Sequence, residues 1–287
     1  MFPFLFLYFF LFFFRYTNYS LEYNIKPQIK LILEKMADAN INYNTAVNYW
    51  ESTTSDVNGV LGGYGEQTTL PQVEQQGSLK FIKKLKSRML MNKDEEIMYG
   101  RRVMDFGAGI GRVTKNVLYK INEGNPHQQT MRFDLLEPAS NFVDQMRIDL
   151  QPVNEQGLLG DIYHMGMQDW PHNVQDGSMD NKKYWLIWCQ WCLGQVPDNE
   201  LIYLLERCKK LLVKNGTIVV KENTINSFGL DEQDEFDPQD SSVTRTDNKF
   251  RWIFEKAGFN LIACERQKGL PEELFPVRMY ALKPRED

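Results

Sequence analysis

Arg101-Arg-Val-Met-Asp-Phe-Gly-Ala-Gly-Ile-Gly-Arg112 is the most informative segment of this chain. It begins as an apolar, strand-like run that ends at Asp105, continues with glycines at positions 107, 109 and 111, and passes into a helix-like run. Glycines let the backbone turn sharply and approach a ligand closely, because they lack a Cβ atom. The N-terminus of the following helix offers free N–H groups and a partial positive charge. The segment therefore predicts a Rossmann-like nucleotide site and leaves the nucleotide open.

The composition excludes few classes of protein but sets useful limits. The 287 residues suffice for one large α/β domain or two small ones. Apolar residues make up 43% and charged residues 25%, which is ordinary for a globular protein. The net charge of −5 argues against a protein that binds nucleic acid by bulk electrostatics. The four cysteines form no small disulfide framework and suit a reducing compartment.

The N-terminal residues differ from the rest of the chain. Met1 to Phe14 contains eight phenylalanines and no charged residue. The run is short for a membrane span, and it lacks the basic start and cleavage site of a signal peptide. It could be a targeting or anchor segment, an apolar helix that packs on the domain, or the product of a start codon assigned too far upstream of Met36. We favour the last reading or a poorly ordered extension, and we expect an extension over 1–35 and one domain over 36–287. Unless residues 1–14 act as an anchor, no membrane contact is expected.

Strand-like and helix-like segments alternate from Arg101 onward. Ahead of them we expect a helix over 21–50, a second helix from Ser78 as N-cap, and a loop from Asn92 to Tyr99. Asn215-Gly216 is interpreted as the stop signal of a helix over 201–213. An acidic, irregular segment is expected over 227–242. Strands are expected at 103–106, 133–137, 158–164, 184–189, 217–222, from 259, and at 277–282. This alternation predicts a mainly parallel, seven-stranded sheet with helices on both faces and an added N-terminal helical layer.

The spacing of the glycines favours one nucleotide over another. A dinucleotide fingerprint reads G-x-G-x-x-G, whereas the glycines here fall as G-x-G-x-G and Arg112 follows. Glu137 ends the second expected strand, where a carboxylate can accept hydrogen bonds from both ribose hydroxyls of an adenosine. These features favour S-adenosylmethionine (SAM) over NAD. A dehydrogenase and a glycine turn that serves only packing are the alternatives.

From about Tyr49 to Leu282 the chain resembles the N-terminal Xaa-Pro-Lys α-N-methyltransferases, a class I SAM-dependent family that methylates protein N-termini. The Leu-Gly-Gly-Tyr-Gly and Asp-Ser-Ser segments are more particular to this family than the glycine loop. The matching segments, in family order, are Tyr49-Trp50, Leu61-Gly-Gly-Tyr-Gly65, Asp105-Phe-Gly-Ala-Gly-Ile-Gly-Arg112, Gly166-Met-Gln-Asp169, Gln190-Trp191 with Gly194, Lys221-Glu-Asn223, Asp240-Ser-Ser-Val243 and Leu270-Pro-Glu-Glu273.

The resemblance implies a role for each matching position. On the cofactor side, Gly107, Arg112 and Gln190 would meet the methionine part of SAM. Glu137, Pro138 and Ala139 would hold the ribose, although the family usually has aspartate at position 137, and Met167 and Gln168 would lie along the adenine. On the substrate side, the implied contacts are Trp50 in a lid, Trp191 along the peptide channel, Asn223 at the first residues of the peptide, and Asp237, Asp240 and Ser242 around its basic third side chain.

Two positions depart from the family pattern. Gln195 stands where the family usually has a histidine proposed to help deprotonate the amine, and a glutamine cannot take up a proton at neutral pH. Asp240 would then act alone as the base beside Gln195, or water would carry the proton away. Arg278 matches the position of a substrate-site tyrosine and would repel a basic peptide unless it points away or pairs with an acid.

The remaining candidates are assigned from chemistry. Methyl transfer needs a neutral amine, and an acidic channel entrance attracts a basic substrate. Asp237 and Asp240 suit such an entrance, whereas 231–235 is interpreted as a solvated acidic loop. Trp185 and Trp188 are expected in the core. Cys189 and Cys192 have no second pair for a zinc site, so no metal is expected.

The sequence thus predicts a SAM-dependent enzyme that methylates the α-amino group of proteins with an exposed Xaa-Pro-Lys-type N-terminus. By resemblance it is expected in the cytoplasm and nucleus. A methyltransferase of another amine or protein site and a weakly active module that only binds N-termini are the alternatives.

Overall fold

The computed structural model describes residues 36–91, 93–121, 131–172, 179, 181–225 and 233–285. The predicted N-terminal extension, 1–35, lies outside these ranges, and so do residues 227–232 of the acidic segment predicted to be irregular.

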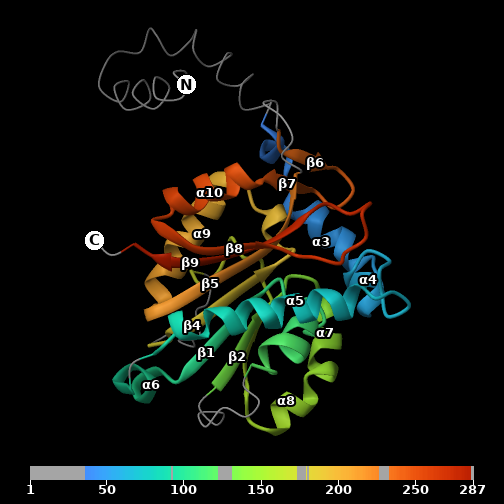
Figure 1. Cartoon of the computed structure of the whole chain (residues 1–287). Helices are drawn as coiled ribbons and strands as arrows, with labels where there is room; N and C mark the ends of the chain where they lie inside the picture. Colours follow the sequence, from blue (N-terminus) through green and yellow to red (C-terminus); the bar gives the residue numbers. More distant parts are fainter. Residues whose placement is uncertain are drawn as a thin grey trace, which may run out of the picture.

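A twisted sheet forms the centre of the molecule (Figure 1). Its parallel part has the order β3-β2-β1-β4-β5, and β9 pairs antiparallel with both β5 and β8. The bounds are β1 Arg101–Phe106, β2 Met131–Leu136, β3 Leu159–Tyr163, β4 Tyr184–Gln190, β5 Leu212–Ile225, β8 Phe259–Arg266 and β9 Val277–Pro284. These seven strands are the ones predicted from the sequence.

The expected count of seven strands is nevertheless wrong, because the described residues form nine. The two further strands are β6, Glu235–Asp237, and β7, Ser242–Thr246, which pair antiparallel with each other. β7 also runs parallel to the last residues of β5. β6 falls in the segment predicted to be irregular, 227–242, and β7 begins at its last residue. They are short and carry charged side chains, so they give no alternating apolar pattern.

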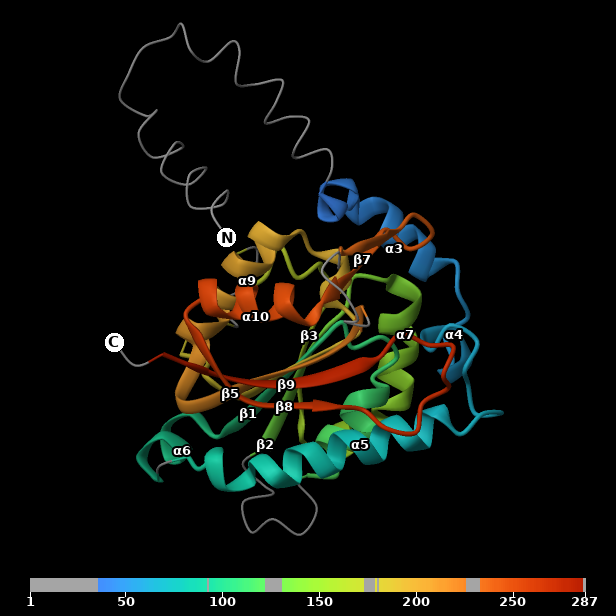
Figure 2. The ribbon, with the colours of Figure 1, turned by 45° about the horizontal axis from the view of Figure 1, so that its top comes forward.

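Helices cover both faces of the sheet (Figure 2). On one face lie α5 Leu70–Leu85, the single π-helical turn η3 Thr114–Leu118, α7 Ser140–Asp149 and α8 Gln151–Glu155. Their apolar side chains form one cluster with the sheet, which includes Phe81, Val117 and Met146. On the other face, α9 Asp198–Leu211 and α10 Asp247–Lys256 form a second cluster. The predicted arrangement of helices on both faces of a mainly parallel sheet is confirmed.

An N-terminal helical layer covers the carboxyl ends of the strands. It consists of η1 Ala37–Asn40, α3 Tyr43–Glu51 and α4 Val57–Val60. The Asn42 N–H donates to Ser241 Oγ at 2.8 Å, and Ser140 Oγ donates to a carboxylate oxygen of Glu51 at 2.8 Å. These contacts attach the layer to the turn before β7 on one side and to α7 on the other, so it encloses the region beyond the strand ends.

Four local predictions differ from the structure. The helix expected over 21–50 is interrupted in its described part, because η1 ends at Asn40 and α3 begins at Tyr43. α5 begins at Leu70, not Ser78, with Pro71 in its first turn, and Ser78 is buried in the middle of the helix. Asn92 to Tyr99 was expected to be a loop, yet α6 spans Lys93–Tyr99, where three acidic residues in the first turn suit the helix dipole.

Asn215-Gly216 is not a helix stop, because α9 already ends at Leu211 and β5 begins at Leu212. A Cβ at Gly216 would lie 2.9 Å from the carbonyl oxygen of Tyr184. The glycine therefore serves the close approach of β5 to β4.

Candidate active site

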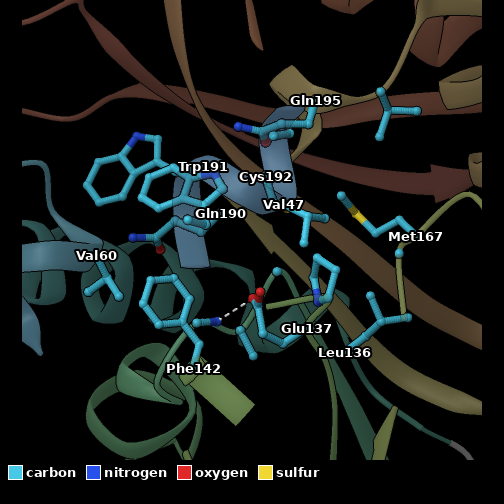
Figure 3. A pocket seen from close by; sticks show the side chains of 18 of the residues that line it. Val47, Val60, Leu136, Glu137, Phe142, Met167, Gln190, Trp191, Cys192 and Gln195 are labelled. Atoms are coloured by element: carbon cyan, nitrogen blue, oxygen red, sulfur yellow. Dashed lines mark hydrogen bonds between the residues drawn. The ribbon is translucent and has the colours of Figure 1, made fainter. Parts of the chain in front are cut away.

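A cavity opens at the carboxyl ends of β1, β2 and β4, beneath α3 (Figure 3). This is where open α/β sheets usually bind ligands. We call it the first cavity. Its walls include the glycine loop after β1, the residues after β2, and Trp50 and Val60 of the N-terminal layer. The predicted cofactor residues that line it are Gly107, Arg112, Glu137, Pro138, Met167, Gln168 and Gln190.

The glycine loop is held open by its backbone conformation. All three of its glycines have positive φ, which residues with a side chain rarely adopt. A Cβ on Gly107 would lie 2.4 Å from the Cβ of Cys192, which also lines the cavity. The loop therefore packs against the end of β4 while its own backbone forms the cavity wall.

Glu137 is the buried carboxylate of the first cavity. Its Oε2 accepts the Gly109 N–H at 2.9 Å, and its Oε1 accepts the Ala139 N–H at 2.9 Å. Burial raises the pKa of Glu137 to about 7, although the two backbone N–H groups act in the opposite direction. Each oxygen can accept a further hydrogen bond, so this carboxylate can receive two hydroxyl groups from a ligand.

Asp105 of the glycine segment is buried at the end of β1. Thr114 Oγ1 donates to its Oδ2 at 2.7 Å, and burial raises its pKa to about 7. Asp105 does not line the first cavity. It lies beneath the glycine loop, where its hydrogen bond to Thr114 connects β1 to the turn after the glycines.

A second cavity adjoins the first and opens toward the β6–β7 hairpin. The two cavities share Trp50, Val60, Trp191 and Gln195. Of the predicted substrate residues, the second cavity is also lined by Asn223, Asp240 and Ser242. Its remaining wall is rich in apolar and aromatic side chains, among them Leu70, Tyr64, Leu274 and Phe275. A cavity with apolar and aromatic walls and an acidic residue at one side suits a basic peptide.

Asp240 and Gln195 face each other at the junction of the cavities. Gln195 Nε2 donates to Asp240 Oδ2 at 3.4 Å, and the Ser242 N–H donates to Asp240 Oδ1 at 3.1 Å. Partial burial raises the pKa of Asp240, and the nearby charge of Asp237 raises it further. A carboxylate with a raised pKa is a better proton acceptor than an exposed one.

Trp191 and Asn223 form a pair on the wall of the second cavity. Trp191 Nε1 donates to Asn223 Oδ1 at 3.1 Å. Glu222, which sequence reasoning did not select, also lines this cavity. Its Oε1 accepts the backbone N–H groups of Cys192 and Leu193, both at 2.8 Å, and burial raises its pKa to about 7. Glu222 therefore fixes the turn that follows Trp191.

Three predicted positions lie elsewhere than expected. Ala139 does not line the first cavity but packs with Ile110 and Phe142 beneath the N-terminal layer. Asp237 is exposed and lies outside both cavity walls, where its Oδ1 accepts the Gln239 N–H.

Arg278 does not border the second cavity, so it meets the stated condition under which it would not repel a basic peptide. Successive residues of a strand point to opposite faces, and Val277 is the residue of β9 that lines the cavity. The Arg278 guanidinium lies 4.0 Å from Asp247. Phe275, two residues before β9, is the aromatic residue at this cavity.

The predicted positions of the three tryptophans near β4 agree with the structure. Trp188 is fully buried and Trp185 is buried, whereas Trp191 lines the cavities, as expected.

Within the described ranges, no group of three or more His, Cys, Asp or Glu side chains could hold a metal ion. None of the helices in those ranges is long and apolar enough to span a membrane.

The fold and the first cavity define a class I methyltransferase. A family model described as AdoMet dependent proline di-methyltransferase matches residues 38–283, and the chain belongs to this family. SAM is therefore its cofactor, and the enzyme is a methyltransferase.

Curated relatives and a solved structure agree with this assignment. The chain is 38% identical to the alpha N-terminal protein methyltransferase 1 of Schizosaccharomyces pombe, with 84% of this chain and 96% of the relative covered. It is 31% identical to the N-terminal Xaa-Pro-Lys N-methyltransferase 1-A of Xenopus laevis, with 84% and 95% covered. A SAM-dependent methyltransferase structure from Leishmania major superposes with a TM-score of 0.66 at 29% identity and covers 84% of this chain and 82% of its own.

Proposed function

We propose that this enzyme transfers methyl groups from SAM to the α-amino group of proteins with an exposed Xaa-Pro-Lys-type N-terminus. The observation that carries the proposal is the junction of the two cavities at Trp191 and Gln195, with Asp240 on the substrate side. A methyl group presented from the first cavity would face an amine held in the second. The names of the relatives support this substrate class.

The residues of the first cavity fit SAM. The Arg112 guanidinium suits the carboxylate of the methionine part, and Glu137 suits the two ribose hydroxyls. Pro138, Met167 and Gln168 continue the wall on the side proposed for the adenine. SAM supplies an electrophilic methyl group, and the chain has to align the amine behind that methyl carbon and exclude water. The N-terminal layer, through Trp50 and Val60, closes the cavity on the open side.

The proposed role of Glu137 predicts a pH-dependent affinity for SAM. Hydroxyl donors favour the ionised carboxylate, so a pKa of about 7 in the free enzyme should fall when SAM binds. Affinity should therefore be highest above pH 7. Below pH 7 it should decrease, and the decrease should approach about tenfold per pH unit. Calorimetric titration with S-adenosylhomocysteine between pH 6 and 8.5 measures this slope. A Glu137→Gln variant should bind more weakly and lose the slope, and an unchanged slope in that variant would contradict the assignment.

The residues of the second cavity fit a basic N-terminal segment. We assign Trp50 and Trp191 to the walls beside the first residues, and Asn223 and Ser242 to hydrogen bonds with the peptide. Asp240 is assigned as the acceptor of the proton that the amine releases. Asp237, exposed beyond the cavity edge, would attract the third side chain through its charge without direct enclosure.

The substrate proposal predicts strong dependence on the third residue of the peptide. A Ser-Pro-Lys peptide should receive label from SAM on its α-amine. Replacing its lysine by glutamate should lower kcat/KM by about 100-fold, because a like charge would face Asp237 and Asp240. A peptide with glutamine at the same position is the matched neutral control, and its kcat/KM should lie between those of the lysine and glutamate peptides. Mass spectrometry of the products locates the label.

Two results would sink the substrate proposal. One is equal labelling of the lysine and glutamate peptides. The other is an unlabelled α-amine together with clear SAM binding, which would favour a methyltransferase of another amine or protein site.

For location in the cell, we propose the cytoplasm and nucleus. The support is the family resemblance and the four cysteines, all free in the structure, which suit a reducing compartment. Microscopy of the chain with a C-terminal fluorescent tag, started at Met1 and separately at Met36, tests both the location and the influence of residues 1–35. Retention of either form on a membrane would contradict the proposal.

A further inference from the structure

A buried polar cluster lies behind both cavities and is centred on Glu74 of α5. The Glu74 side chain is fully buried. Its carboxylate pairs with the Arg112 guanidinium through Oε1, and its Oε2 accepts from Lys221 Nζ at 2.8 Å and from Gln190 Nε2 at 3.0 Å. Three side chains from three different parts of the sheet edge therefore meet at one carboxylate carried by a helix that precedes β1.

The charges of this cluster are fixed by its hydrogen bonds. The fully buried Lys221 donates to the Glu74 carbonyl oxygen at 2.9 Å, to Glu74 Oε2 and to Ser78 Oγ at 2.9 Å, which uses all three of its protons. Burial alone would raise the pKa of Glu74, but the charges of Arg112 and Lys221 outweigh it and hold that pKa below its usual value. Burial lowers the pKa of Lys221, whereas the Glu74 carboxylate acts in the opposite direction and favours the ammonium form. With Lys221 and Arg112 both charged, two cations face one anion, which suits an anionic ligand group beside Arg112.

The cluster reaches the cofactor side directly. Arg112 and Gln190 both line the first cavity, and Glu74 contacts the polar end of each. Gln190 is further fixed by Trp188, whose Nε1 donates to its Oε1 at 3.2 Å. Because both side chains are held from behind, their remaining polar atoms are oriented before a ligand arrives.

The cluster reaches the peptide side through Lys221. The Lys221 ammonium lies 5.6 Å from the centroid of the Trp191 ring, and its carbonyl oxygen accepts the Trp191 N–H at 3.0 Å. Trp191 has a φ of 53°, a conformation that costs free energy in a residue with a side chain and must be held by its surroundings. Figure 3 shows Gln190 and Trp191 side by side at the cavity wall.

We propose that Glu74 is a positioning residue that fixes the cofactor-binding side chains Arg112 and Gln190 and, through Lys221, the substrate-side ring of Trp191. The inference rests on the proposed function for its substrate half. α5 packs on the same face of the sheet as α7 and α8. The proposal gives this helix a role in aligning the two reactants. No ligand atom is expected to touch Glu74.

A Glu74→Gln variant of the full chain tests the proposal. Glutamine keeps the size of the side chain but leaves Arg112 and Lys221 as two buried cations without a counter-charge. We expect the Kd for S-adenosylhomocysteine and the KM for a Ser-Pro-Lys peptide each to rise about tenfold or more, with a smaller change in kcat. Gln76→Ala, on the exposed face of the same helix, is the matched control and should change neither value.

A second variant isolates the substrate half and protects the test if Glu74→Gln folds poorly. Lys221→Met removes the ammonium beside Trp191 while Glu74 keeps Arg112 and Gln190. It should raise the peptide KM by about tenfold and leave S-adenosylhomocysteine affinity within about threefold. The fluorescence of Trp191, obtained as the difference from a Trp191→Phe enzyme, should shift in both variants without any peptide present.

The outcomes separate this inference from the substrate proposal. If Glu74→Gln lowers only the melting temperature and leaves both binding constants and the Trp191 signal unchanged, the residue is merely structural and the inference fails. A loss of cofactor affinity alone, with an unchanged Trp191 signal, also overturns it. If the wild-type enzyme methylates no peptide, the proposed function fails, while S-adenosylhomocysteine binding and the Trp191 signal still decide the role of Glu74.

Discussion

Replacing Asp240 by asparagine should lower kcat for peptide methylation by about 100-fold or more at pH 7.5, because the site loses its proton acceptor. Asparagine has the same shape, so its side-chain oxygen can still accept the Ser242 N–H. Asp240 does not line the first cavity, and SAM affinity should therefore stay unchanged. Steady-state kinetics and a calorimetric titration with S-adenosylhomocysteine give both values.

The pH profile distinguishes proton transfer from simple charge attraction. A free α-amine has a pKa of about 7.7–8.0, so most of it is already neutral at pH 9.5. The defect of Asp240→Asn should shrink there to less than about tenfold. Asp237→Asn removes the neighbouring charge from outside the cavity wall and should raise KM more than it lowers kcat. A defect of Asp240→Asn that is confined to KM, or constant between pH 7 and 9.5, would count against the base.

A variant of Gln195 tests the same proton transfer by a gain of function. Its side-chain nitrogen lies 3.4 Å from Asp240 Oδ2, so an imidazole at this position would be close enough to share the proton. Gln195→His should raise turnover in the wild-type background and restore part of it in Asp240→Asn. If Gln195→His raises turnover in neither the wild-type nor the Asp240→Asn enzyme, the position has no role in proton transfer.

The sequence predicts best those parts of the site whose residues are close together along the chain. The strand, the three glycines and the start of the next element occupy consecutive residues, and Glu137 follows the next strand, so their meeting at one sheet edge follows from the parallel topology. The positions of Trp191 and Asn223 at the ends of β4 and β5 follow from the same rule.

The parts that escaped prediction depend on contacts between distant residues. Glu74 sits among polar residues in a helix, and nothing nearby in the sequence shows that Lys221 will neutralise it. The start of α5 at Leu70 carries no capping hydrogen bond from Thr69, so the usual start signal is absent. The contrast between Arg278 and Phe275 depends on which residue begins β9, and a shift of one residue reverses the face of a strand.

Gly107→Ala should strongly weaken SAM binding and also destabilise the protein. The added Cβ would lie 2.4 Å from the Cβ of Cys192, and alanine would have to adopt a φ of 60°. The left-handed conformation costs about 1–2 kcal/mol, and overpacking against a buried neighbour adds about 1–3 kcal/mol. The chain can relieve this strain only by moving the glycine loop, which forms the wall of the first cavity. We therefore expect a fall in SAM affinity of more than about 100-fold, a free-energy difference of about 2.7 kcal/mol.

Gly157→Ala is the matched control for the backbone cost. Gly157 has a φ of 67° but open space around its Cβ position, and it lies outside the walls of both cavities. This variant should lose about 1–2 kcal/mol of stability and keep its SAM affinity. Denaturant unfolding and calorimetry measure the two effects separately.

A pair of double variants identifies the clash as the cause. Cys192→Gly removes the atom that the new Cβ would meet, so Gly107→Ala with Cys192→Gly should regain a large part of the lost SAM affinity. Cys192→Ala keeps that Cβ atom and removes only the sulfur. The double variant Gly107→Ala with Cys192→Ala should therefore keep the low SAM affinity of Gly107→Ala. Equal rescue by both would show that the sulfur, not the Cβ contact, makes position 107 intolerant. Rescue by neither would mean that the left-handed backbone alone requires glycine there.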